Sequence, residues 1–88
     1  MARRYLVWGR VQGVGFRNFA QREGHRLGVI GYTRNLDDGR VEVYALGTPA
    51  QLSELAGRLR IGPMMADVRG LEEVEAAPES HAGFRIRH

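Results

Sequence analysis

Hydrophobic residues recur along this chain with two periods, one typical of strands and one typical of helices that bury a single face. They alternate with period two in several short segments, and they recur at i, i+3, i+4 and i+7 in two longer ones. The predicted strands are 4–9, 29–35, 40–46, 68–75 and 84–87. The predicted helices are 14–27 and 49–61, the second with a stripe of Leu52, Leu55, Ala56 and Leu59.

Local start and stop signals bound both helices and one hairpin. Gly28 follows the first helix, where a glycine is common. The segment Thr48–Gln51 fits a capping box with proline in the first helical position, and Gly62-Pro63 ends that helix. The segment Leu36–Gly39 predicts a tight hairpin turn, because Asp-Gly supplies the positive φ angles that such a turn needs.

The first predicted strand is apolar on both faces, since Tyr5 and Val7 alternate with Leu6 and Trp8. We therefore expect Trp8, like the three phenylalanines, to belong to the core. The alternative role for these rings is a platform on which nucleic-acid bases stack, which is less common for such residues.

The order of the predicted elements is strand, helix, strand, strand, helix, strand, with a short strand at the end. This order predicts an α+β fold of the ferredoxin-like, split β-α-β type, with two helices on one face of a four- to five-stranded antiparallel sheet. Residues 1–88 are expected to form a single domain, because a chain of this length supports one modest core. A right-handed crossover makes the first two strands parallel, with the third between them.

Two features of this topology lie at the same predicted edge of the sheet. The segment Gly9–Arg17, GRVQGVGFR, leaves the first strand and enters the first helix, and Asn35 ends the second strand. Glycines, the amides at a helix start and Arg17 are together typical of a phosphate-binding loop. An ordinary glycine-rich turn with a solvated arginine is the alternative that the residues leave open. The glycine spacing fits neither of the common nucleotide-binding motifs.

Two separate segments resemble the signatures of the acylphosphatase family. The first is Gly9–Arg17 along its whole length, and the second is GYTRN at residues 31–35. After the second segment the family's intervals are matched by Gly39, Val41 and Gly47. The resemblance extends over nearly all of the chain, including residues 84–87. One departure is Thr33, where the family usually has a small apolar residue, on the same strand face as Asn35.

The resemblance implies hydrolysis of the carboxyl-phosphate bond of acyl phosphates to a carboxylate and inorganic phosphate. It assigns the attacking water to the side-chain amide of Asn35, and the proton of that water to an oxygen of the substrate's own phosphate. Such a reaction needs neither a metal nor an organic cofactor, and the expected partner is a small acyl phosphate. The phosphoryl oxygens are assigned to Arg17 and to the main-chain amides of Gln12, Gly13, Val14, Gly15 and Phe16.

The residues near this edge favour a substrate that is already activated, because they include no strong base. The chain has no cysteine, and no serine or histidine is close in sequence to either motif. Thr33 is the one hydroxyl nearby and, without a base beside it, is expected to be a packing residue. Asp37-Asp38 is expected to serve the hairpin rather than a metal. The three histidines, His25, His81 and His88, lack metal-ligand spacing.

The composition of the chain limits which kinds of partner the protein is expected to bind. The net charge is +3, and all thirteen basic residues are arginines, spread along the chain without a basic stripe. Nucleic-acid binding is therefore not expected, and no apolar run is long enough for a signal peptide or a membrane span. We expect a free-standing, cytoplasmic, monomeric enzyme.

Two alternatives stay open beside this interpretation. One is a non-catalytic ferredoxin-like module that binds phosphate compounds or RNA, since this fold serves many functions. The other is a domain similar to the acylphosphatase-like part of the hydrogenase-maturation carbamoyl transferases, which act on carbamoyl phosphate.

Overall fold

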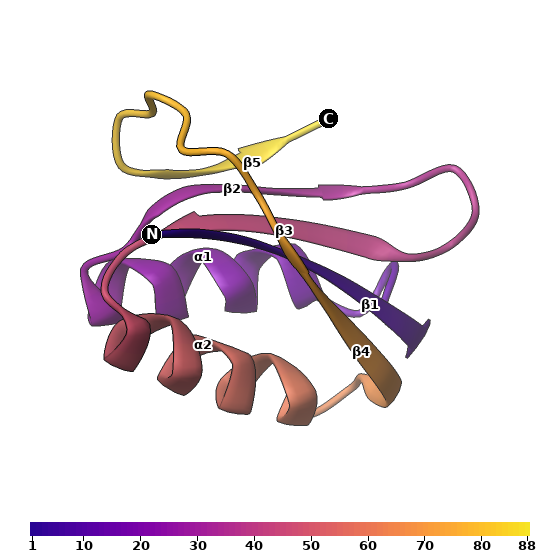
Figure 1. Cartoon of the computed structure of the whole chain (residues 1–88). Coiled ribbons are helices and arrows are strands. Elements are labelled where there is room, and N and C mark those ends of the chain that lie inside the picture. The colour runs from indigo at the N-terminus through magenta and orange to yellow at the C-terminus, as the bar shows by residue number, and fades with distance from the viewer.

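The computed structural model describes all residues from 1 to 88 and contains every predicted element (Figure 1). The strands are β1 (Ala2–Arg10), β2 (Ile30–Asn35), β3 (Val41–Leu46), β4 (Asp67–Glu75) and β5 (Phe84–Arg87). The helices are α1 (Phe16–Leu27) and α2 (Pro49–Ile61). The bounds differ most at β1, which begins two residues before the predicted start, and at α1, which begins two residues after it.

Partner strands and one glycine account for both differences. Ala2 pairs with Leu46 of β3, and Arg10 pairs with Asp67 of β4. Pairing with these neighbouring strands therefore extends β1 at both ends. Gly15 has a left-handed φ of 81°, which makes Phe16 the first residue in the conformation of α1.

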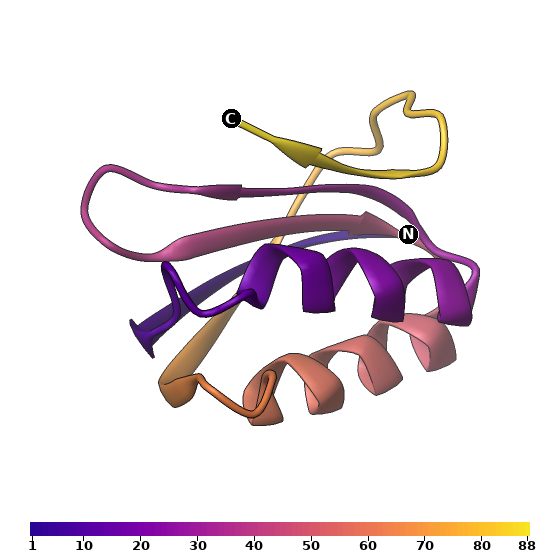
Figure 2. The same cartoon turned by 180° about the vertical axis from the view of Figure 1, so that it is seen from behind.

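The molecule has two layers, a sheet and a pair of helices on one of its faces (Figures 1 and 2). The strand order in the sheet is β4-β1-β3-β2-β5. β3 is antiparallel to both β1 and β2, so these two strands are parallel with β3 between them, as predicted. β1 and β2 therefore end at the same edge of the sheet, and the loops that follow them lie at one end of the molecule.

The prediction of a purely antiparallel sheet is wrong, because β5 is parallel to β2 and the sheet is mixed. β4 ends where Glu75 pairs with Arg3, at the start of β1. Residues 76–83 then cross the sheet at that same end (Figure 2). β5 enters the sheet where Gly31 of β2 pairs with Phe84, so both strands start together and run in the same direction.

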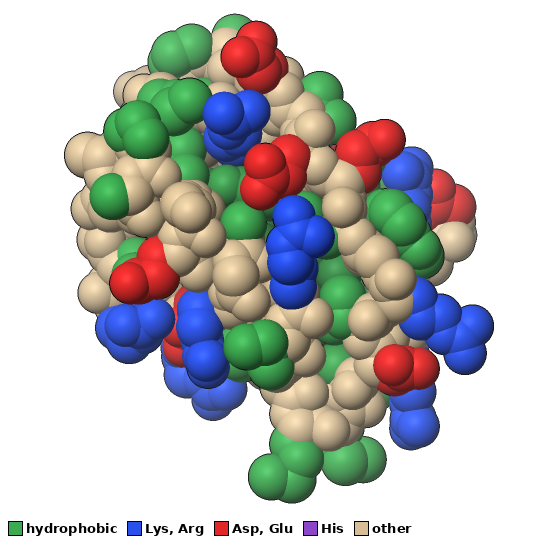
Figure 3. All heavy atoms as spheres, turned by 60° about the horizontal axis from the view of Figure 1, so that its bottom comes forward, with side chains coloured by type: hydrophobic (Ala, Val, Ile, Leu, Met, Phe, Trp, Pro, Cys, Tyr) green, Lys and Arg blue, Asp and Glu red, His purple; other side chains and the backbone are tan.

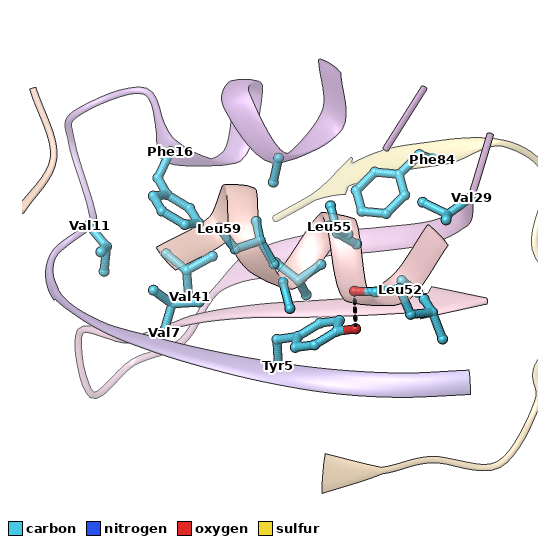
Figure 4. Packing of buried hydrophobic residues seen from close by; sticks show 14 residues of the cluster. Tyr5, Val7, Val11, Phe16, Val29, Val41, Leu52, Leu55, Leu59 and Phe84 are labelled. Carbon is cyan, nitrogen blue, oxygen red and sulfur yellow. Dashed lines mark hydrogen bonds between the residues drawn. The ribbon is translucent and has the colours of Figure 1, made fainter. Parts of the chain in front are cut away.

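Apolar side chains from both helices and from the helix-facing side of the sheet form the main core (Figure 4). All four residues of the predicted stripe on α2 are buried. The hydroxyl of Tyr5 donates a 3.1 Å hydrogen bond to the carbonyl oxygen of Leu52, which provides this buried phenol with a partner. Burial raises the pKa of Tyr5 to about 12. The largest fully buried side chains include Tyr5, Tyr44, Phe16, Phe84, Leu55 and Leu59.

Trp8 lies on the open face of the sheet and not in the core, contrary to the prediction. It is 42% exposed. Its ring lies over Gly70 of β4, where an added Cβ would come within 2.2 Å of Cζ2 of the indole. β1 is apolar on both faces, but the helices cover only the face that carries Tyr5 and Val7. The three phenylalanines are buried, as predicted.

A second, smaller cluster covers another part of the open face. Tyr32 and Tyr44 stack with their ring centroids 5.5 Å apart, and the ring of His81 lies against both. The hydroxyl of Tyr44 donates to the carbonyl oxygen of Ala77 at 2.8 Å and accepts from the N–H of Glu79 at 2.7 Å. These bonds hold the segment before β5 over the two tyrosines, both of which are buried.

The structure confirms the capping box of α2 and revises the hairpin turn. Thr48 Oγ1 accepts from the N–H of Gln51 at 3.2 Å, and Gln51 Oε1 accepts from the N–H of Thr48 at 2.8 Å. In the turn, Gly39 has a φ of 96°, but no residue other than glycine has a positive φ, so Asp38 lacks the expected conformation. Asp38 instead accepts a 3.1 Å hydrogen bond from the N–H of Arg40.

Acidic and basic side chains are interspersed over the helix side of the molecule (Figure 3). Glu23 of α1, for example, accepts from Arg26 at 2.9 Å and from Arg58 of α2 at 3.2 Å. This side therefore carries mixed charge rather than one basic stripe. Neither helix is long and apolar enough to cross a membrane.

Candidate active site

Two glycines in a left-handed conformation shape the loop between β1 and α1. Gly13 has a φ of 74° and Gly15 a φ of 81°, a region that residues with a Cβ rarely occupy. A Cβ added at either position would meet nothing within 4 Å. The backbone conformation, and not a lack of space, therefore requires glycine at both positions.

Gly9, the first residue of the same motif, has a different role. Its φ is 116°, and an added Cβ would lie 2.3 Å from the carbonyl oxygen of Asp67 in β4. It also stands at the register shift between β1 and β4. Gly9 therefore allows a close approach of two strands, and it is not part of the loop's anion-facing backbone.

The main-chain N–H groups of this loop have no acceptor within the protein. Those of residues 12–15 donate neither to a carbonyl nor to a side chain. α1 then begins at Phe16 without a side-chain cap and without an acidic residue in its first turn. The first N–H groups of a helix lack partners inside it and form the positive end of its dipole. The loop and the helix start together present several donors suited to an anion.

A pocket of about 420 Å³ opens beside this loop and brings the two motifs together. Arg17 and Asn35 both line it, as the topology predicts, although they are far apart in the sequence. None of the lining side chains is acidic, and only those of Arg17 and His88 are ionisable. Gln12 and Val14, two of the residues predicted to bind phosphate through their main-chain amides, are not among the residues that line the pocket. The lining residues are Val11, Gly13, Gly15, Phe16, Arg17, Asn18, Asn35, Ile86 and His88.

Arg17 lies in the first turn of α1 and is half-buried. Its Nη1 donates to the carbonyl oxygen of Arg87 at 3.4 Å and lies 3.4 Å from Nδ1 of His88. Arg17 forms no ion pair with a carboxylate, unlike Arg4, Arg26 and Arg34. Most of its guanidinium donors therefore remain available to a ligand. Nothing in the sequence predicts that His88 lies next to Arg17, because this contact depends on where β5 joins the sheet.

The side chain of Gln12 ties the loop to the hairpin between β2 and β3. Its Nε2 donates to the carbonyl oxygen of Leu36 at 2.8 Å and to that of Arg40 at 2.9 Å. Figure 2 shows the loop and the hairpin at the same end of the molecule. From the sequence we assigned only the main-chain amide of Gln12 to the site. The function of its side chain was missed, because the two acceptors are backbone atoms 24 and 28 residues away.

Asn35 is the last residue of β2 and pairs with Val41 of β3. Its Oδ1 is buried and has no hydrogen-bond partner within the protein. The same is true of Oγ1 of Thr33, and these are the only buried side-chain polar atoms in the chain without a partner. Thr33 is fully buried, in agreement with its predicted packing role.

The other candidate groups lie elsewhere or serve the fold. Asp38 bonds to Arg40 within the hairpin, as expected for Asp37-Asp38. His25 contacts the carbonyl oxygen of Phe84 at 3.0 Å, and His81 lies at 3.0 Å from Glu79. No three His, Asp or Glu side chains are grouped so that they could hold a metal ion.

Comparisons with known proteins agree with these motifs. The sequence model of the family described as Acylphosphatase matches residues 3–86. An acylphosphatase of Solibacter usitatus is 66% identical over 86 residues, which covers 98% of this chain and 90% of that protein. An acylphosphatase of Archaeoglobus fulgidus is 43% identical over 82 residues, covering 93% and 92%.

Solved structures agree as well. The crystal structure of acylphosphatase from Bacillus subtilis superimposes with a TM-score of 0.94 at 35% identity, over 99% of this chain and 98% of that one. A crystal structure of full-length HypF shares the fold, with a TM-score of 0.87 at 24% identity, over 99% of this chain but only 12% of that chain. Sequence motifs, family match and near-complete coverage of relatives together place this chain in the acylphosphatase family.

Proposed function

We propose that this acylphosphatase-family protein hydrolyses acyl phosphates at the pocket between the β1–α1 loop and the end of β2. The observation that carries the proposal is the meeting, at one pocket, of Arg17, Asn35 and a loop whose N–H groups have no acceptor in the protein. In this assignment the loop and Arg17 bind the phosphoryl group, and Asn35 binds the attacking water.

The phosphoryl group would be held by donors that are in place before the substrate arrives. In this proposal the N–H groups of residues 12–16 bind the phosphoryl oxygens at the positive end of α1, and Arg17 adds a planar pair of donors that matches phosphate oxygens. It is supported by the lack of an acceptor within the protein for the N–H groups of residues 12–15. The phosphoryl oxygens carry negative charge throughout the reaction, while the electron pair of the breaking P–O bond goes to the leaving carboxylate. Preorganised donors of this kind each contribute about 10²–10³ in rate.

The water would be oriented by the side-chain amide of Asn35. The oxygen of this water attacks phosphorus in line with the leaving carboxylate, and a new P–O bond forms. The P–O bond to the acyl group breaks, and its electron pair stays on the carboxylate. The proton of the water passes to a phosphoryl oxygen. The products are a carboxylate and inorganic phosphate. Placing the water near phosphorus lowers the entropic cost of the bimolecular step.

The ionisable groups of the pocket fit a substrate with a good leaving group. Arg17 and His88 are the only ionisable side chains in its wall, and His88 lies against Arg17 rather than against Asn35. The site thus offers no carboxylate base to activate a poor nucleophile. A carboxylate leaves without needing a proton, so an acyl phosphate requires only binding, orientation and charge stabilisation.

We also propose that the protein acts as a monomer in the cytoplasm and does not bind nucleic acid. The stacked Tyr32 and Tyr44, on the open face where bases would stack, are buried beneath the segment before β5. Light scattering after gel filtration should give the mass of one chain. Titration with a short single-stranded RNA should give no saturable binding, whereas binding that weakens steeply with salt would support the alternative.

Hydrolysis of benzoyl phosphate, followed by absorbance, tests the proposal. The wild type should turn the substrate over, Arg17→Ala should lose both affinity and turnover, and Asn35→Ala should lose mainly turnover. Arg22→Ala is a matched control, since Arg22 is an exposed arginine of the same helix outside the pocket. If Arg17→Ala and Asn35→Ala keep the rate of the control, the two roles are wrong even where the activity itself is present.

A further inference from the structure

We propose that Thr33 is a positioning residue that acts through Asn35, by way of one buried water molecule. The Thr33 hydroxyl donates to this water, and the water donates to Oδ1 of Asn35. The inference rests on the proposed role of Asn35 in hydrolysis. It assigns a function to the one residue of the second motif that departs from the pattern of the resemblance.

The first support is that two partnerless atoms occur together. Oγ1 of Thr33 and Oδ1 of Asn35 are the only buried side-chain polar atoms of the chain without a hydrogen bond in the protein. A buried polar group without a partner is rare in native proteins, because its desolvation is not compensated. Two such atoms, two residues apart on one strand, therefore indicate a shared partner.

Strand geometry gives the right separation for a single water. Residues i and i+2 of a strand point to the same face, and their Cα atoms lie about 6.5–7 Å apart. The two side chains make no direct hydrogen bond to each other. One water bridges two oxygens that lie up to about 5.6 Å apart, which side chains on one face of a strand reach by leaning toward each other. Ordered waters commonly satisfy buried polar groups in this way.

The pocket supplies the path by which the water enters. Asn35 lines the pocket, and so does Ile86 of β5. Ile86 pairs with Thr33 in the parallel register of β2 and β5. The pocket thus reaches two residues that flank Thr33, Asn35 along β2 and Ile86 on the neighbouring strand β5.

The consequence for the reaction is the orientation of an amide. The two ends of a carboxamide have nearly the same shape but opposite hydrogen-bonding character. Oδ1 of Asn35 is buried, so Nδ2 is the end that the pocket can reach. A donor that reaches Oδ1 favours this orientation over the flipped one. Thr33 would therefore raise the fraction of molecules in which Asn35 presents N–H donors to the attacking water.

Steady-state hydrolysis of benzoyl phosphate by four proteins tests the inference: wild type, Thr33→Val, Thr33→Ser and Asn35→Ala. Thr33→Val keeps the shape but removes the donor, so kcat should fall about tenfold, the equivalent of one hydrogen bond, with KM unchanged. Thr33→Ser keeps the hydroxyl and should retain kcat within about twofold of the wild type, as expected if one donor carries the effect. A merely structural role would instead follow the loss of side-chain volume and would affect Ser more than Val.

The double variant Thr33→Val/Asn35→Ala decides whether Thr33 acts through Asn35. In the Asn35→Ala background, Thr33→Val should change kcat by less than about twofold, because residues that act as one unit are not additive. Unchanged kcat in Thr33→Val together with a higher melting temperature would overturn the inference, since the hydroxyl would then be only an unpaired buried group. If Asn35→Ala itself retains the full rate, the assigned role of Asn35 and this inference both fail.

Discussion

The side-chain nitrogen of Gln12 lies 2.8 Å from the carbonyl oxygen of Leu36, and it also donates to the carbonyl oxygen of Arg40 at 2.9 Å. Leu36 follows Asn35 directly in the sequence. One side chain of the β1–α1 loop therefore holds the hairpin that carries the proposed water-binding residue. These two hydrogen bonds link the two halves of the candidate site directly, in addition to the sheet pairing of β1 and β2 through β3.

Gln12→Met should reduce kcat more than it raises KM, because it removes both donors but keeps the length of the side chain. It should also lower the free energy of unfolding by about 1–3 kcal/mol, the equivalent of two lost hydrogen bonds, although both carbonyl oxygens keep a bond from a backbone N–H of the hairpin. Gln21→Met is the matched control, since Gln21 donates a 3.1 Å bond to the carbonyl oxygen of Phe84, outside the pocket wall. The control should lose stability but keep kcat. Equal kcat in both variants would argue against a role of the Gln12 hydrogen bonds in positioning Asn35.

Arg17→Lys should weaken phosphate binding although the positive charge is kept. Lysine lacks the planar fork of the guanidinium, so the inhibition constant of inorganic phosphate should rise about tenfold. Because Arg17 forms no ion pair with a carboxylate, the urea midpoint should change little. An unchanged inhibition constant would show that phosphate binding in the pocket needs only the positive charge and not the bidentate geometry of the guanidinium.

Gly15→Ala should fold but lose stability and activity. The φ of 81° is strained for alanine by about 1–2 kcal/mol, while the space around the added Cβ is empty. Gly31→Ala is the informative contrast, because its Cβ would lie 1.9 Å from the carbonyl oxygen of Tyr44. Urea denaturation should therefore show a modest loss for Gly15→Ala and a much larger loss, or no folded protein, for Gly31→Ala.

Stability should fall at high pH because of Tyr5. Burial raises its pKa from 10.0 to about 12, so the folded state holds this proton more tightly than the unfolded state does. The corresponding stability is fully present below pH 10.0, the unfolded value, and is lost as the pH rises to about 12. The loss should be about 2–3 kcal/mol. Urea unfolding measured between these limits should show a shallower decline for Tyr5→Phe, and equal slopes would contradict the assignment.

Much of the fold could be predicted because its signals are local. The stripe of α2 and its capping box depend on residues within one or two helical turns, and both are confirmed. The parallel relation of β1 and β2 follows from the handedness of a crossover, so the meeting of Arg17 and Asn35 at one edge could be anticipated. The family and its activity were predicted from two long motifs, and the comparisons confirm them. The roles of the individual site residues stay predictions.

The amino-acid sequence by itself determined which segments form helices and strands, which face of α2 is buried and which loop is rich in glycine, because these properties depend on near neighbours and backbone sterics. Only the tertiary structure decided that Trp8 stays on the surface, that β5 runs parallel to β2, and that Gln12 and His88 contact groups distant in sequence. Alternation shows that both faces of a strand are apolar, but not which face the helices will cover. Likewise, the partners of an edge strand or a side-chain amide are backbone groups, and every residue type offers these alike.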